Sequence, residues 1–99
     1  GPVVIFGAGG IYTELIKDTS IRICPVTKEE ALKMIDETIF SKILHGYRGE
    51  KSNIDSLANI IVKVSNIMMK NKKIQELDLN PVFVNPLRAI VADARIIFS

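Results

Sequence analysis

The spacing of apolar residues predicts short strands at both ends of the chain and two helices between them. Before the first helix, three apolar stretches have the length and the β-branched content of strands. They cover residues 3–6, 11–17 and 21–24. Asp18-Thr19-Ser20 supplies turn residues between the last two stretches, and Pro25 ends the third. The run Gly7-Ala8-Gly9-Gly10 indicates either unusual backbone angles or the close approach of another group.

Two amphipathic segments follow, and each has the features of a helix start. Thr27 and Glu30 form a capping box, in which each side chain satisfies a backbone N–H group. Ser52, with Asp55 three residues later, is the expected cap of the second helix. Residues 44–51 include two glycines and predict a loop between the helices. Helical spacing predicts buried faces made of Ala31, Leu32, Ile35 and Ile39, and of Ile54, Leu57, Ile61, Val64 and Met68.

The end of the chain predicts a β-hairpin. Residues 74–84 and 89–98 have the composition of strands and are joined by Asn85-Pro86-Leu87-Arg88. Three strands, two helices and a final hairpin favour an α+β fold. We expect a mostly antiparallel sheet of about five strands with two main helices, and we expect residues 1–99 to form a single unit.

Composition narrows the class of protein. The 99 residues are 47% hydrophobic with a net charge of +2, which is typical of one folded domain. No apolar run approaches the roughly 20 residues that a membrane span requires. The single cysteine and single histidine exclude a disulfide scaffold and a Cys/His metal cluster, and a reducing cytoplasm is expected. The basic run Lys70-Asn71-Lys72-Lys73 lacks interleaved aromatic residues, so we expect a helix end and no nucleic-acid partner.

The hairpin carries the side chains with the clearest chemistry. Alternate side chains share one face of a strand. Glu76, Asp78 and Asn80 therefore point together, away from the two leucines between them. Two carboxylates and a carboxamide without a lysine among them are unusual for a solvated strand face.

The turn fixes which residues of the hairpin oppose one another. If the strands pair directly from the turn at residues 85–88, Asn80 lies opposite Asp93 and Asp78 lies opposite Arg95. Directly opposed side chains lie about 4.5–5.5 Å apart at Cβ. A bulge at the proline that follows Asn80 would break this register.

This register gathers oxygen ligands for a metal ion. Asp78, Asn80 and Asp93 would lie close together on one face, and hard oxygen donors of this kind suit Mg²⁺. Arg95 would offset the charge of Asp78 or contact a phosphate oxygen. The alternative is a solvated face without a metal, on which Asp78 and Arg95 form a cross-strand ion pair.

Longer motifs resemble one known family. Glu76-Leu77-Asp78-Leu79-Asn80-Pro81, followed by Ala92-Asp93-Ala94, is similar to the metal-binding end of the ATP-grasp fold. The chain resembles the ADP-forming acetate–CoA ligases (acetyl-CoA synthetases), which are relatives of succinyl-CoA synthetase. Gly1-Pro2-Val3-Val4-Ile5-Phe6-Gly7 with Gly9-Gly10-Ile11 resembles the glycine-rich segment of that family, and Gly46-Tyr47-Arg48-Gly49 resembles one of its loops. The resemblance runs from residue 1 to about residue 98.

The resemblance implies a metal role for three residues of the hairpin. Asn80 and Asp93 match the two magnesium ligands of the family. Asp78 stands where many relatives have glutamate, and this shorter carboxylate can bind through water. Arg95 and Asp78 are also expected near the nucleotide phosphates.

Three residues outside the hairpin gain candidate roles from the same resemblance. Arg48 and Arg22 become candidates for contacts with phosphate or acyl phosphate, against a role as surface or bracing arginines. Glu14 becomes a candidate nucleotide contact. Glu14, Lys17-Asp18, Arg22 and Pro25 fall where the family has an acidic, turn and arginine pattern.

The family implies an activity for a larger protein. Its members interconvert acyl-CoA, ADP and phosphate with free acid, CoA and ATP, through an acyl phosphate and a phosphohistidine. The implied cofactors are Mg²⁺ with ATP or ADP. The implied partners are an absent N-terminal ATP-grasp lobe and a CoA-binding subunit or domain that carries the phosphohistidine. His45 is then a loop residue, and the chain, which begins with Gly1 in place of Met, is the C-terminal half of an ATP-grasp domain and inactive alone. The competing hypothesis is a stand-alone binding or assembly module that keeps the fold without the chemistry.

Overall fold

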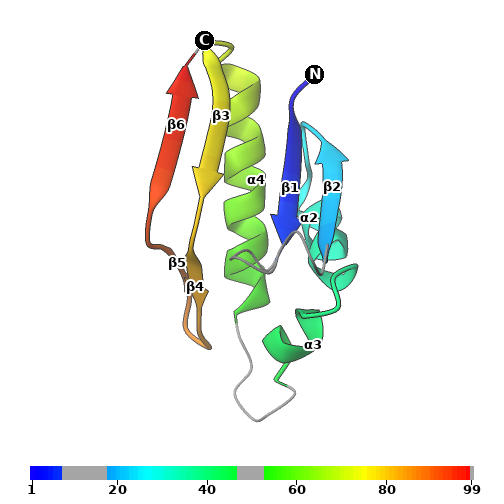
Figure 1. Ribbon diagram of the computed structural model, residues 1–99. Helices are drawn as coiled ribbons and strands as arrows, with labels where there is room; N and C mark the ends of the chain where they lie inside the picture. The colour runs from blue at the N-terminus through cyan, green and yellow to red at the C-terminus, as the bar shows by residue number, and fades with distance from the viewer. Residues whose placement is uncertain (8–17, 47–52, 99) are drawn as a thin grey trace.

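The computed structural model describes residues 1–7, 18–46 and 53–98, apart from the side chain of residue 43. Strands lie in front of helices in Figure 1, where α2 lies behind β1 and β2. The long helix α4 contacts β1, β3 and β5 as well as α2. The elements are β1 (Val3–Gly7), β2 (Thr19–Ile23), α2 (Lys28–Asp36), α3 (Ser41–Leu44), α4 (Ile54–Lys70), β3 (Ile74–Leu79), β4 (Val82–Val84), β5 (Ala89–Val91) and β6 (Ala94–Phe98).

The described strands pair in three antiparallel ladders, β1–β2, β3–β6 and β4–β5. The α+β class and the antiparallel pairing are confirmed, although the expected sheet of about five strands is divided into these ladders. Each long strand of the predicted hairpin is interrupted, one at Asn80-Pro81 and the other at Ala92-Asp93. Pro81 has no N–H group to donate to a ladder, which accounts for the first break. The strand expected over residues 11–17 lies outside the described residues.

Gly7 lies where the β1–β2 ladder brings two backbones close together. It pairs with Thr19, so two residues of the expected turn at 18–20 belong to β2. A Cβ atom on Gly7 would lie 2.7 Å from Cγ2 of Thr19 and 3.2 Å from the backbone oxygen of Asp18. For Gly7, the close approach predicted from the glycine run is confirmed.

The first helix begins as predicted and ends earlier. Thr27 Oγ1 accepts a hydrogen bond from the backbone N–H of Glu30 at 3.2 Å, which confirms one half of the capping box. The Glu30 carboxylate binds Arg22 of β2. Because α2 ends at Asp36, Ile39 lies beyond it and is 74% exposed, so the prediction that Ile39 belongs to the buried face is wrong.

The connection to α4 contains a short helix that the sequence pattern did not predict. Helix α3 ends at Leu44, inside the segment expected to be a loop. Asn53 caps α4, and its Oδ1 accepts the backbone N–H of Ser56 at 3.0 Å. The expected cap, Ser52, lies one residue earlier and outside the described residues. An asparagine is as good a cap as a serine, so composition alone could not choose between neighbours.

The core lies between the strands and the two long helices. The predicted faces of α2 and α4 are largely confirmed, and Met34, Ala58 and Ser65, which the pattern left out, are 0% exposed. The single cysteine is a small buried side chain, as expected. Within the described residues, no helix combines the length and the apolar content that crossing a bilayer requires. The buried apolar residues are Val4, Cys24, Val26, Ala31, Met34, Ile35, Leu57, Ala58 and Ile61.

Candidate metal centre

The predicted register of the hairpin is confirmed on both sides of the candidate centre. Asp78 lies opposite Arg95 in the β3–β6 ladder. Beyond the end of that ladder, the backbone N–H of Asn80 donates to the carbonyl of Asp93 at 3.1 Å, and Ala92 donates to Pro81 at 3.0 Å. The β4–β5 ladder continues in the same register. Asn80 and Asp93 therefore oppose one another at the junction of the two ladders.

The irregularity in this hairpin lies at its far end. Pro81 introduces no extra residue into the pairing, and the Asn80–Pro81 peptide is cis. The shift in register falls between Ile74 and Glu76, where β3 begins. The bulge that would have separated Asn80 from Asp93 is thus absent from the described pairing.

Several oxygen atoms of the candidate centre are open for coordination. The half-buried Asp78 carboxylate makes no hydrogen bond or ion pair with the described residues, and neither does the exposed side-chain amide of Asn80. Asp93 Oδ1 accepts the backbone N–H of Ala94 at 2.9 Å, which orients that carboxylate. Two carboxylates and one carboxamide at neighbouring ladder positions suit Mg²⁺, which completes its coordination with water and phosphate oxygens.

Arg95 takes a partner other than the one expected. Its Nη2 lies 3.2 Å from Oε1 of Glu76, which is a diagonal neighbour rather than the directly opposed residue. Both side chains are more than half exposed, so the pair adds little to stability. The Asp78–Arg95 ion pair of the alternative without a metal is not formed, and the Asp78 carboxylate stays open. Within the described residues, no group of three His, Cys, Asp or Glu side chains could hold a metal ion. The candidate centre has two carboxylates, and its third oxygen ligand is the side-chain amide of Asn80.

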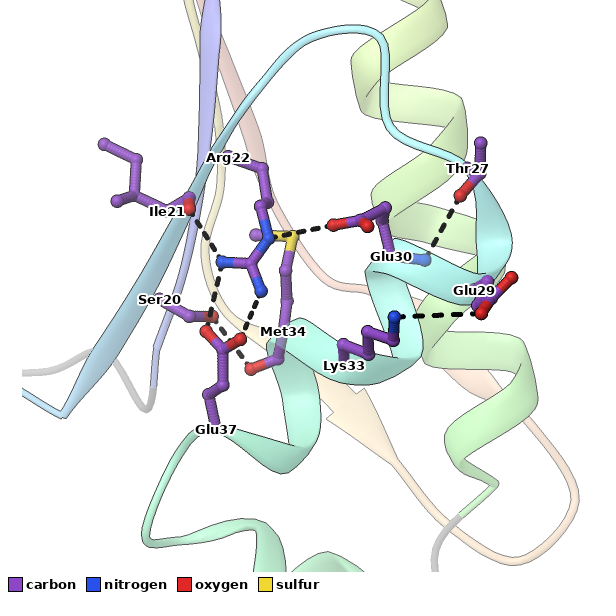
Figure 2. A network of polar contacts seen from close by, with 9 residues as sticks. All are labelled: Ser20, Ile21, Arg22, Thr27, Glu29, Glu30, Lys33, Met34 and Glu37. Atoms are coloured by element: carbon purple, nitrogen blue, oxygen red, sulfur yellow. Dashed lines mark hydrogen bonds and ion pairs between the residues drawn. The ribbon is translucent and has the colours of Figure 1, made fainter.

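Arg22 is engaged by two carboxylates, one on Glu30 of α2 and one on Glu37, the residue that follows α2, as Figure 2 shows. Its Nε lies 3.0 Å from Glu30 Oε2, and its Nη1 contacts both Glu37 Oε1 at 3.0 Å and the Ile21 carbonyl at 2.9 Å. Nη2 bonds the second oxygen of Glu37. Glu37, followed by Glu30, raises the pKa of the Arg22 guanidinium. Arg22 in turn holds the pKa of the Glu37 carboxyl below its usual value.

This network favours the bracing role that the sequence left open for Arg22. Four of the five N–H donors of a guanidinium are used, one on Nε, two on Nη1 and one on Nη2. The bonds to Glu30 and Glu37 join β2 to the start of α2 and to the residue that follows its end, and the four bonds together leave little capacity for a phosphate. The predicted phosphate contact of Arg22 stays a prediction. Glu14 and Arg48 lie outside the described residues, and their predicted contacts also remain predictions.

Asp18 and Asn53 each hold a described loop in place, and sequence reasoning missed both roles. Asp18 accepts backbone N–H groups from Ile39 at 2.7 Å and from Phe40 at 3.0 Å, which fixes the chain between α2 and α3. Asn53 donates through Nδ2 to the Leu87 carbonyl at 3.0 Å and so joins the start of α4 to the β4–β5 turn. Both contacts join residues more than twenty positions apart, so only the cap propensity of Asp and Asn could have suggested them.

Comparison with known proteins identifies the family to which the chain is related. The model of the ATP-grasp domain family matches residues 1–98. The chain is 51% identical over 98 residues to subunit beta of acetate–CoA ligase [ADP-forming] I from Pyrococcus furiosus, covering 98% of this chain and 42% of that protein. It is 46% identical over 85 residues to 4-hydroxybutyrate–CoA ligase [ADP-forming] from Nitrosopumilus maritimus, covering 85% of this chain and 12% of that protein.

A solved structure gives the same result in three dimensions. Acetyl-coenzyme A synthetase 1 of Ca. Korarchaeum cryptofilum, in complex with coenzyme A and Mg-AMPPCP, superposes with a TM-score of 0.95 at 40% identity. The match covers 100% of this chain and 47% of that one. The chain thus spans less than half the length of these relatives. Because the family model matches nearly every residue, the chain belongs to the ATP-grasp domain family, and its relatives include ADP-forming acyl-CoA ligases.

Proposed function

We propose that this chain is the C-terminal half of the ATP-grasp domain of an ADP-forming acyl-CoA synthetase. The whole enzyme interconverts acyl-CoA, ADP and phosphate with free acid, CoA and ATP. The observation that carries the proposal is the opposition of Asn80 and Asp93 beside the open carboxylate of Asp78. Relatives that match nearly the whole chain are named as ligases of this kind.

Within this proposal, the hairpin holds Mg²⁺ against the phosphates of ATP or ADP. Asn80 and Asp93 supply oxygen ligands, and Asp78 supplies a third oxygen either directly or through water. Bound Mg²⁺ would neutralise negative charge on the phosphates during phosphoryl transfer. Arg95 is exposed, and its described ion pair is to the exposed Glu76, so it can turn to a phosphate oxygen at small cost.

The remaining parts of the active site belong to sequence outside this chain. The Korarchaeum structure includes coenzyme A and a phosphohistidine segment that points towards the nucleotide binding site. We propose an equivalent arrangement here, with a phosphohistidine other than the exposed His45, which contacts Asp36 at 3.1 Å. Glu14 and Arg48 are proposed contacts to nucleotide and acyl phosphate. The buried, unpaired Cys24 fits a reducing compartment, and we place the enzyme in the cytoplasm.

The test uses a chimeric ligase, in which this chain replaces the matched segment of the Pyrococcus furiosus subunit beta. The chimera, assembled with the rest of its ligase, should form ATP from acetyl-CoA, ADP and phosphate. The double variant Asn80→Ala/Asp93→Ala should lose on the order of 100-fold in rate, because it removes stabilisation of transferred phosphate charge. Gln75→Ala, an exposed change at the far end of β3, serves as the matched control and should retain activity.

The competing hypothesis of a stand-alone module makes opposite predictions. It predicts that the correctly folded chimera forms no ATP. Full activity in the Asn80→Ala/Asp93→Ala variant would instead reject the metal centre while leaving the family assignment intact.

A further inference from the structure

Asn53 binds the turn of the hairpin as well as its own helix. Its Oδ1 accepts the backbone N–H of Ser56 at 3.0 Å, which caps α4. Its Nδ2 donates to the carbonyl of Leu87 at 3.0 Å, and its backbone N–H donates to the carbonyl of Asn85 at 2.8 Å. We call these two bonds to the β4–β5 turn the Asn53 clamp. The turn lies at the same end of the molecule as the start of α4 (Figure 1).

The bond to the turn explains why an asparagine stands at this cap. Asparagine and aspartate cap helices about equally well. A carboxylate offers only acceptors, whereas the asparagine amide offers an acceptor and two donors. The helix cap uses the acceptor of Asn53, so its NH₂ group is left facing the carbonyl of Leu87. Capping alone does not require a donor at this position, but the clamp does.

The turn that receives the clamp is closed by hydrogen bonds of its own. Asn85 Oδ1 accepts the backbone N–H groups of Leu87 at 2.8 Å and of Arg88 at 3.0 Å. The backbone N–H of Asn85 donates to the carbonyl of Arg88 at 3.0 Å. A displacement of this turn therefore moves both strands that leave it.

Continuous pairing connects the turn to the candidate metal centre. The β4–β5 ladder begins at the turn and runs for three pairs. Ala92 then donates to Pro81, and Asn80 donates to Asp93, in the same register. Asn80 lies five positions before Asn85, which is roughly 16 Å along an extended strand. The clamp thus holds one end of the ladder whose other end leads to the metal ligands.

The candidate centre depends on how the two ladders of the hairpin are oriented. Asp78 belongs to β3, whereas Asn80 and Asp93 lie between the ladders, so the three oxygen ligands converge only in one relative orientation. Both long strands are interrupted at this junction, and every residue of β6 is exposed. The β4–β5 ladder has firmer supports, which are the clamp at its turn and three side chains packed against the core, Val82, Val84 and Ala89.

We propose that Asn53 is a positioning residue for the Mg²⁺ centre, acting through the β4–β5 ladder rather than by contact with the ion. Without the Nδ2 bond, the turn samples more orientations, and only a fraction of them brings Asn80 and Asp93 into the geometry that binds the ion. The measured affinity falls in proportion to that fraction. The inference rests on the proposed function, because it requires that Asp78, Asn80 and Asp93 hold the metal.

A single substitution separates the clamp from the helix cap. Asn53→Asp keeps the acceptor that caps α4 and loses the donor to Leu87. Asn59→Asp, at an exposed position on the same helix, adds the same charge and is the matched control. Mn²⁺ stands in for Mg²⁺, and electron paramagnetic resonance of the chimeric ligase with ADP measures its affinity. Asn53→Asp should weaken Mn²⁺ binding by about 2- to 10-fold, which is the net contribution of one hydrogen bond, whereas Asn59→Asp should bind like the parent.

Hydrogen exchange of the metal-free chimera, followed by mass spectrometry, reports the same effect without the ion. In Asn53→Asp, the segment 80–92 should exchange about 2- to 10-fold faster than in the parent, while β1 and β2 keep their rates. Faster exchange in β1 and β2 to the same extent would show a general loss of stability and would overturn the positioning role.

The Asn80→Ala/Asp93→Ala variant distinguishes failure of this inference from failure of the proposed function. If that variant loses Mn²⁺ affinity while Asn53→Asp binds the ion like the parent, the clamp is overturned and the metal centre stands. If the double variant binds Mn²⁺ like the parent, the metal centre fails and the positioning role fails with it. An equal loss of affinity in Asn59→Asp and Asn53→Asp would assign the effect to charge and would also overturn the clamp.

Discussion

Replacing Ser65 with alanine should destabilise the chain through a single buried hydrogen bond. Ser65 is 0% exposed on α4, and its Oγ accepts the backbone N–H of Val26 at 2.8 Å. Alanine would leave that N–H buried without a partner, at a cost of about 1–3 kcal/mol. Alanine is also a better helix former than serine by roughly 0.5 kcal/mol. The expected net loss in the free energy of unfolding is therefore about 0.5–2.5 kcal/mol.

Urea unfolding followed by circular dichroism measures this loss, provided that the slope of free energy against urea is unchanged. Asn66→Ala is the matched control, because it makes a similar gain in helix propensity at an exposed neighbouring position. The control should be neutral or slightly stabilising. If Ser65→Ala is as stable as the control, the Val26 N–H does not depend on Ser65 and the reasoning is refuted.

Three further substitutions test contacts of the fold and are read by the same unfolding assay. Gly7→Ala should destabilise by about 1–3 kcal/mol, because its new Cβ would meet Thr19 Cγ2 at 2.7 Å. Asn53→Ala removes the α4 cap and should cost about 1–2 kcal/mol. Arg22 lowers the pKa of Glu37, so this carboxylate stabilises the fold above its ordinary titration range, and the contribution is lost as pH falls through its lowered pKa. Glu37→Gln should therefore reduce the loss of unfolding free energy that occurs as the pH falls.

For each substitution, a matched variant shows whether the change in stability comes from the proposed contact. Thr19→Ser removes the methyl group that a Cβ on Gly7 would meet, so the double variant should recover part of the lost stability. Asn53→Asp keeps the capping acceptor and loses only the donor to the β4–β5 turn, so it should cost less than alanine. Glu29→Gln, on the exposed start of α2, should leave the acid dependence unchanged. Equal effects of Glu29→Gln and Glu37→Gln on that dependence would contradict the assignment.

The hairpin could be predicted in detail because its register depends on local sequence. A short turn fixes which residues oppose one another, and the pairing of Asp78 with Arg95 follows by counting back along two strands. The break at Asn80-Pro81 was suggested by proline itself, but composition could not show that the register continues across it. The candidate metal centre could be located because the short turn fixes which residues of the two strands oppose one another.

Long-range polar contacts were beyond the reach of sequence periodicity. Arg22 carries no signal that it binds Glu37 rather than a phosphate, because their partnership depends on how β2 packs on α2. Ser65 is polar, so a search for apolar spacing omitted it from the buried face of α4, although its partner lies 39 residues away. Ile39 was placed in the core because its spacing is helical, whereas α2 ends before it.

Binding of Mn²⁺, used in place of Mg²⁺, to the purified chimera in the presence of ADP tests the central claim most directly. Electron paramagnetic resonance reports the free ion and therefore its affinity without any need for turnover. The account predicts that Asn80→Ala/Asp93→Ala weakens Mn²⁺ binding by at least about 10-fold, whereas Gln75→Ala leaves it unchanged. The same affinity in the double variant and the parent chimera would contradict the metal centre.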